Sequence, residues 1–117
     1  MRERRTGEAW YFEHRKLDVY RVACEFVRWV EALEPPLRGN ANLRDQLRRA
    51  AQSVVLNVAE GANQESLGAR RRHYRIAKGS AGECDAVLDL VEASGVEVAS
   101  GRRLNDRVGA MLARLAR

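Results

Sequence analysis

Apolar residues recur at alternating steps of three and four along four stretches of the chain, which is the spacing of one face of an α-helix. Each stretch is long enough for several helical turns, and the stretches cover residues 17–33, 42–60, 67–92 and 98–116. The chain is also rich in Ala and Leu and has a single Ile, a composition that favours helices over a β-sandwich. We therefore expect an all-α fold with four helices.

The breaks between these stretches are short and carry turn residues. Pro35-Pro36 ends the first helix because consecutive prolines remove backbone donors, and Asn42 has the side chain of an N-cap for the second helix. Gly61 is expected to stop the second helix, and Ser94-Gly95 the third. Short connections place consecutive helices antiparallel, which predicts an up-down-up-down four-helix bundle.

A chain of 117 residues has enough apolar material for one domain. We expect this domain over residues 12–117, after a flexible, basic N-terminal arm over residues 1–11 with exposed aromatic side chains. The first helix carries adjacent apolar stripes over about half its circumference, so it either meets another subunit or lies deep in its own core. In the third helix, Gly79 and Gly82 are expected to let two backbones approach closely.

The second helix carries a polar stripe beside its apolar one, again at three-four spacing. Its members include amide and hydroxyl side chains in place of interchangeable charged ones, and the stripe consists of Gln46, Arg49, Ser53, Asn57 and Glu60. Such side chains make directed hydrogen bonds. The stripe therefore indicates either a network across a helix contact or an oligomer seam, or a set of side chains that faces a ligand.

The strongest charge feature is a basic block at residues 70–78, in a chain whose net charge is +5. Helical spacing places Arg71, Arg75 and Lys78 on one side, whereas Arg70 and Arg72 point elsewhere. A block of this kind attracts polyanions such as RNA or DNA, and Tyr74 is expected to add stacking on an unpaired base. Its predicted extension on the second helix consists of Arg44, Arg48 and Arg49. The alternative is a solvated helix start whose arginines pair with Glu60, Glu65 or a neighbouring subunit.

Most catalytic and metal-binding classes lack their residues in this chain. Two distant cysteines, Cys24 and Cys84, indicate neither a disulfide framework nor a zinc site, and we interpret both as small buried hydrophobes. Neither histidine has the Glu three residues before it that a di-iron bundle needs. The remaining catalytic possibility is a cleft that contains Glu60 and Glu83. Because the other classes lack their residues, we expect no enzyme, cofactor or metal. No apolar run is long enough to cross a bilayer, which favours the cytoplasm.

Three stretches resemble the bacterial four helix bundle proteins, also called 23S rRNA intervening sequence proteins: residues 12–23, 43–61 and 74–84. The resemblance implies an up-and-down bundle that assembles into a ring-like homopentamer and has no established enzymatic activity. It also implies relatives that serve as accessory variability determinant proteins of diversity-generating retroelements, where they bind nucleic acid and a reverse transcriptase. The shared motif residues, which carry no agreed chemical role, are Gln46, Ser53, Asn57, Glu60, Gly61, Ser80 and Glu83.

Two functions follow as hypotheses. The first is a non-catalytic, oligomeric nucleic-acid-binding protein that contacts structured RNA, from an intervening sequence or a retroelement, through its Arg-rich surface. Repetition of one basic patch around a ring would multiply weak contacts. The alternative is a protein-interaction scaffold, for example a reverse-transcriptase accessory subunit, that does not bind nucleic acid directly.

Overall fold

The computed structural model describes residues 10–33 and 41–117, and this part of the chain is all-α, with no strand. A short 3-10 helix, Glu13–Lys16, precedes four α-helices: α1 (Asp18–Glu31), α2 (Ala41–Ala62), α3 (Leu67–Ala93) and α4 (Ala99–Leu115). The predicted all-α class and the four predicted helices are confirmed. The predicted loop at residues 34–40 and residues 1–9 of the predicted arm lie outside the described residues.

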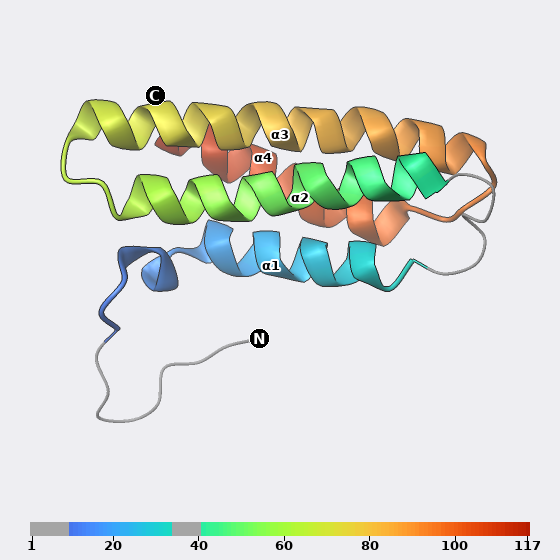
Figure 1. Cartoon of the computed structure of the whole chain (residues 1–117), viewed down its shortest axis with the longest axis horizontal. Helices are drawn as coiled ribbons and strands as arrows, with labels where there is room; N and C mark the ends of the chain where they lie inside the picture. The colour runs from blue at the N-terminus through green and yellow to red at the C-terminus, as the bar shows by residue number, and fades with distance from the viewer. Residues whose placement is uncertain (1–9, 34–40) are drawn as a thin grey trace.

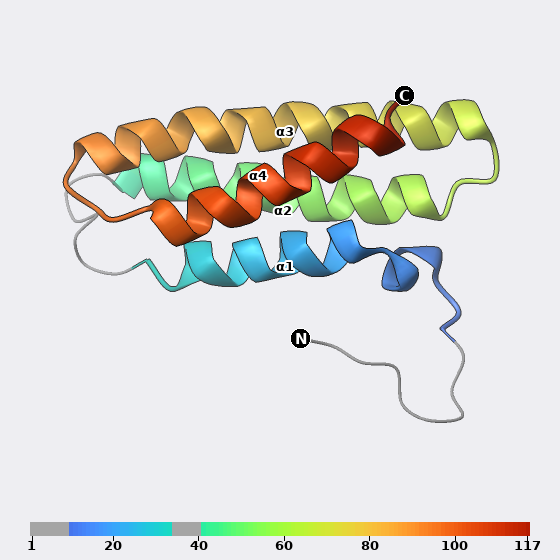
Figure 2. The same cartoon turned by 180° about the vertical axis from the view of Figure 1, so that it is seen from behind.

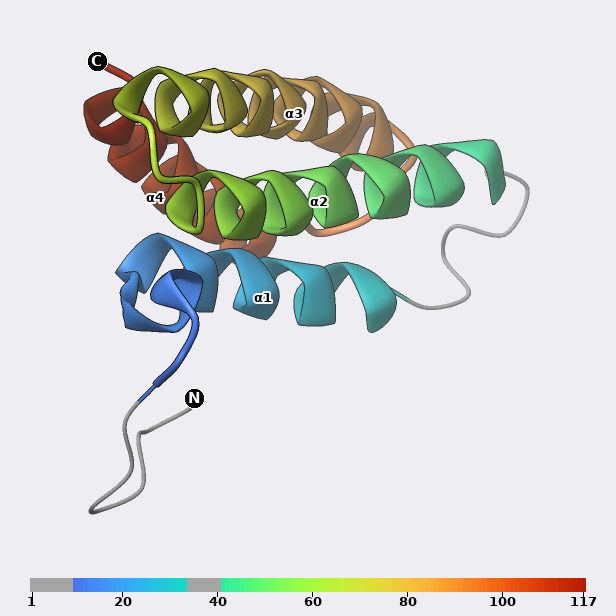
Figure 3. The ribbon, with the colours of Figure 1, turned by 60° about the vertical axis from the view of Figure 1, so that its left-hand side comes forward.

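The helices lie side by side along the long axis of the molecule (Figure 1). The α2–α3 connection is at one end, and the α3–α4 connection at the other (Figure 1). Helix α4 slants across the back of the bundle, where it packs on α1 and α3 (Figure 2). Figure 3 brings forward the end at which the start of α3 lies beside the end of α4. This end carries the basic block of α3.

The core consists of two apolar clusters, one in each half of the bundle. Phe26, Leu47 and Leu88 are central to the first, whereas Val22, Val58 and Leu112 are central to the second. Five of them come from the stripes that three-four spacing identifies in the sequence, whereas Leu112 lies beside the expected stripe of α4, whose Met111 and Leu115 are half-buried. The apolar face of α1 is wider than its buried part, because Tyr20 and Val27 stay half-exposed at its edge.

Two helix boundaries differ from the sequence-based expectation. Asn42 lies inside α2, which already begins at Ala41, so the predicted N-cap is wrong. Gly61 does not stop α2, because it lies within the last turn of the helix and its φ is not positive. Its Cα faces the ring of Tyr74. Gly95 does end its turn in the expected way, with φ of 93°. A glycine therefore ended a helix only where the backbone needed the left-handed region.

The glycines of α3 do not allow the close approach predicted for them. Gly79 and Gly82 are exposed, and a Cβ on either would have no neighbour within 4 Å. Close approach occurs instead at Gly61 against Tyr74, and at Gly101, where a Cβ would lie 2.5 Å from the ring of Trp29. Close packing is therefore set by which side of each helix meets a neighbour.

The two cysteines differ in environment, and the prediction that both are buried is wrong for Cys24. Cys84 is fully buried, and burial raises the pKa of its thiol from 9.0 to about 12. Cys24 is half-exposed and borders two hollows beside α1. Because Cys84 ionises at a higher pH when folded than when unfolded, its contribution to stability is complete below pH 9 and is lost as the pH rises through 12.

We expect a soluble disulfide reagent at pH 8 to modify one thiol per chain rapidly, that of Cys24. The thiolate is the reactive form, and burial keeps Cys84 protonated at this pH. Counting the released thiolate tests this, with the Cys24→Ser variant as the matched control. Rapid reaction of that variant before denaturant is added would contradict the burial of Cys84.

Candidate nucleic-acid interface

The start of α3 and the end of α4 form an open groove of about 570 Å³ with cationic side chains on both sides. Arg75 and Lys78 come from α3, where their three-residue spacing places them on the side that faces α4. Arg117 follows α4 and lines the same groove, and all three side chains are exposed. The floor consists of small residues, Gly79, Ala113 and Ala116. Small residues here leave room for a bulky anion between the cations.

Arg71 lies one turn before Arg75 and borders a second hollow, of about 420 Å³, at the end of the bundle. Lys16 also lines this hollow, and it pairs with Glu13 at 3.1 Å. The Nε atom of Arg71 is buried and has no hydrogen-bond partner among the described residues. The cationic surface therefore continues from the α3–α4 groove around the end of the bundle.

The other two arginines of the block have different surroundings. The Nε atom of Arg70 donates a hydrogen bond of 2.7 Å to the carbonyl of Gln64, so this side chain holds the α2–α3 turn. Arg72 is exposed and does not line the groove. Tyr74 is buried against Gly61, and burial raises the pKa of its hydroxyl. The prediction that Tyr74 stacks on an unpaired base is therefore wrong, because its ring belongs to the core.

Ion pairing among the described residues does not involve the exposed side of the basic block. No ion pair within the described residues joins a carboxylate to Arg71, Arg75 or Lys78. Glu60, one of the expected partners, instead lies 3.7 Å from Nε2 of His73. Within the chain, the alternative of a self-neutralised helix start is not what the structure shows. An external anion can therefore approach these side chains without breaking an ion pair of the described residues.

Arg44 and Arg48 do not extend this surface, which corrects the prediction that they do. Arg48 makes a two-pronged ion pair with Glu31 on α1 (2.7 and 2.9 Å), which raises the pKa of its guanidinium, and Arg44 donates to the Glu31 carbonyl. At 1.5 Å per helical residue, Arg48 is about 15 Å from Arg75 along the bundle. Arg49 pairs with Asp45 of its own helix at 2.9 Å. These arginines therefore lie away from the groove, and their side chains already have partners on α1 or α2.

Part of the polar stripe of α2 forms a hydrogen-bond network with α3. The hydroxyls of Ser53 and Ser80 lie 2.8 Å apart. Asn57 donates through Nδ2 to the carbonyl of Ser53 (2.9 Å), so its Oδ1 is the atom 3.1 Å from Nδ1 of His73 and accepts a hydrogen bond from the N–H there. Glu60 lies at the other nitrogen of this imidazole. The hydrogen bonds run across a helix contact within one chain.

The remaining members of the motif set do not join this network. Gln46 and Glu83 are exposed and have no hydrogen bond to it. Glu60 and Glu83 do not converge, because their positions on α2 and α3 are about 15 Å apart along the bundle axis. Among the described residues, no group of three His, Cys, Asp or Glu side chains could hold a metal ion. Within the same residues, no helix is long and apolar enough to span a membrane.

Sequence reasoning missed the contribution of α4 to the interface. Arg117 carries no pattern of its own, and it lines the same groove as Arg75. The slant of α4 toward the start of α3 makes this possible (Figure 2). The other end of α4 is fixed by Arg102, which pairs with Asp85 and Asp89 of α3 at 3.0 and 2.9 Å. Asn105, on the same helix, is buried and donates a hydrogen bond to the carbonyl of Ala81 on α3. The spacing of Asp85 and Asp89, one helical turn apart, was the available signal for that contact.

Comparison with known families gives one finding that spans most of the chain. Residues 15–114 match a family model described as 23S rRNA-intervening sequence protein. The match includes α1, α2 and α3 and nearly all of α4. A comparison with curated proteins finds no match.

Proposed function

Because the chain belongs to the 23S rRNA-intervening sequence protein family, we propose that it is a non-catalytic, oligomeric protein that binds nucleic acid, with structured RNA as its target. The observation that carries this proposal is the groove in which Arg75, Lys78 and Arg117 have no carboxylate partner within the described residues. Unpaired guanidinium and ammonium groups on a concave surface fit the phosphate backbone. The family name supports RNA over DNA as the target.

The proposed contacts with the phosphate backbone come from both α3 and α4. Arg75 and Lys78 approach successive phosphates along the α3–α4 groove, Arg71 continues this track at the neighbouring hollow, and Arg117 contacts the backbone from the α4 side. Arg guanidinium groups fork onto two phosphate oxygens, which fixes the orientation of the backbone. Arg72 adds charge at the rim, and Arg70 keeps the turn in place. Phosphate contacts of this kind position RNA by its shape and do not depend on base sequence.

The proposed assembly is a homopentameric ring of antiparallel up-down-up-down bundles in the cytoplasm. Connections at opposite ends of the molecule support the up-down arrangement (Figure 1). In a ring the groove would occur once per subunit, so a long RNA could engage several grooves and gain avidity. Sedimentation of the purified protein tests the number of subunits directly.

The experiment that tests the proposal measures binding of the nuclease-treated protein to a structured RNA across a salt series. Four cations per subunit, three in the groove and Arg71 at the neighbouring hollow, predict a slope of about −3 in log affinity against log salt, and a steeper slope when several subunits bind. A duplex DNA of equal length serves as the control for RNA preference. No binding at low salt would overturn the proposal.

A second candidate function is the protein-interaction scaffold, for example an accessory subunit of a reverse transcriptase. The observation that favours it is an apolar hollow of about 370 Å³ between α1 and α2, at which Leu56 is 60% exposed beside Val27 and Val55. Exposed apolar surface of this kind binds protein by burial, which salt does not weaken. Capture of a reverse transcriptase at high salt, with no RNA binding, would favour this function.

A further inference from the structure

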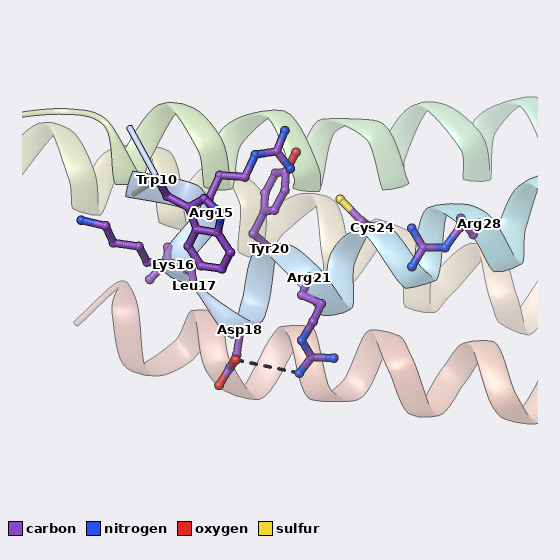
Figure 4. A pocket seen from close by; sticks show the side chains of 9 residues that line it. All are labelled: Trp10, Arg15, Lys16, Leu17, Asp18, Tyr20, Arg21, Cys24 and Arg28. Atoms are coloured by element: carbon purple, nitrogen blue, oxygen red, sulfur yellow. Dashed lines mark ion pairs between the residues drawn. The ribbon is translucent and has the colours of Figure 1, made fainter. Parts of the chain in front are cut away.

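A further hollow, of about 310 Å³, lies beside α1 and shares no lining residue with the α3–α4 groove (Figure 4). Trp10 stands at one end of it and Arg28 at the other, while Tyr20 and Cys24 lie along one side and Asp18 and Arg21 along the opposite side (Figure 4). Pockets that hold small ligands begin at about 300 Å³. The hollow therefore has room for one small planar group with a polar attachment.

The charge of this hollow is strongly positive. Four cations, Arg15, Lys16, Arg21 and Arg28, line it, against one carboxylate, Asp18. Asp18 is largely exposed and lies 3.9 Å from Arg21, which also pairs with Glu25 at 2.9 Å. Arg28 is exposed, and no carboxylate of the described residues pairs with it. Arg28 can therefore take an anion without the loss of an existing ion pair.

The aromatic side of the hollow is held in place by neighbouring groups. The ring of Tyr20 packs against His14, with centroids 4.6 Å apart, and the guanidinium of Arg15 lies 5.6 Å over the same ring. His14 in turn lies 2.9 Å from the side chain of Asn63 at the end of α2. Trp10 comes from the segment before the family match and is half-buried, which corrects the expectation that it is exposed.

We propose that this hollow binds one unpaired nucleotide, with the base against the indole of Trp10 and the phosphate at Arg28. An indole offers a planar surface on which any base stacks, and guanidinium groups bind phosphate. An aromatic wall and an unpaired cation at opposite ends match the two parts of a nucleotide, whereas an acidic peptide would use only the cation. This site goes beyond the proposed function, because it reads an unpaired base on another face of the molecule.

The test is the fluorescence anisotropy of a dye-labelled single-stranded tetraadenylate, compared with an equally labelled abasic tetranucleotide that has the same number of phosphates. The wild-type protein is expected to bind tetraadenylate about tenfold more tightly, because stacking of one base is lost in the abasic strand. Trp10→Ala should remove this difference, whereas Tyr11→Ala, which deletes an exposed aromatic outside the hollow, should retain it. Titration with AMP shows whether the hollow binds a free nucleotide or only a nucleotide that is part of a strand.

Arg28→Ala gives a second readout that does not depend on the packing of Trp10. It is expected to weaken both tetranucleotides and to reduce the salt slope by about 1. Equal binding of the two strands by the wild type, or displacement of tetraadenylate by an acidic peptide as readily as by an unlabelled strand, would overturn the proposal. The α3–α4 groove is a separate surface, so replacing its cations should leave the tenfold preference for tetraadenylate unchanged. Failure of one proposal is thus distinguishable from failure of the other.

Discussion

Replacing Arg71, Arg75 and Lys78 together with Ala is expected to weaken the binding of a structured RNA about 100-fold at ~0.1 M salt. Each side chain contributes a charge-assisted contact of about 1 kcal/mol, and a loss of about 1.4 kcal/mol corresponds to tenfold in affinity. The salt slope should also fall by about 2 to 3, because three phosphate contacts disappear. The fold should persist, because none of the three side chains has an ion pair within the described residues. Binding isotherms at several salt concentrations measure both effects.

The matched control removes three arginines from α2. The variant Arg44→Ala, Arg48→Ala, Arg49→Ala changes the net charge by the same amount, but its side chains pair with Glu31 and Asp45 away from the groove. It should bind RNA nearly as well as the wild type. Equal losses in both variants would show that net charge alone drives binding. No loss in the first variant would remove the α3–α4 groove as the contact surface.

Gly101→Ala is expected to destabilise the fold by about 2 to 3 kcal/mol. A Cβ at this position would lie 2.5 Å from Cε3 and Cζ3 of Trp29. The indole has little freedom to move, because Phe26 stacks on it with ring centroids 6.0 Å apart. Helix α4 would therefore have to move away from α1, and overpacking of this kind costs about 1 to 3 kcal/mol or more. Thermal unfolding should show a midpoint about 10 °C lower.

Gly82→Ala is the matched control, since it adds the same methyl group to the exposed side of α3. Nothing lies within 4 Å of a Cβ there, so the substitution should stabilise the helix by about 1 kcal/mol. The two variants should therefore shift the unfolding midpoint in opposite directions. A wild-type midpoint for Gly101→Ala would show that α1 and α4 separate easily. A lower midpoint for Gly82→Ala would show that another subunit packs on α3.

Part of the candidate interface could be predicted from spacing alone. Residues 71, 75 and 78 share a helical face because their positions differ by four and three, and the structure places that face toward α4. The partners of the arginines could not be predicted in this way. Glu31 binds Arg48 because α1 and α2 are neighbours at that end, and Arg117 joins the groove because α4 slants toward α3. Neither contact has a signature along the chain.

Sequence by itself determined the number of helices, their approximate ends, the core stripes of α1, α2 and α3 and the turn at Gly95, since all of these depend on interactions within a few residues. Only the tertiary structure decided which glycines are closely packed, which arginines are paired and that Tyr74 is buried. The physical reason is that helical periodicity fixes the direction of a side chain about its own helix axis. It does not fix which neighbouring helix lies in that direction, how far away it is, or at what angle it crosses.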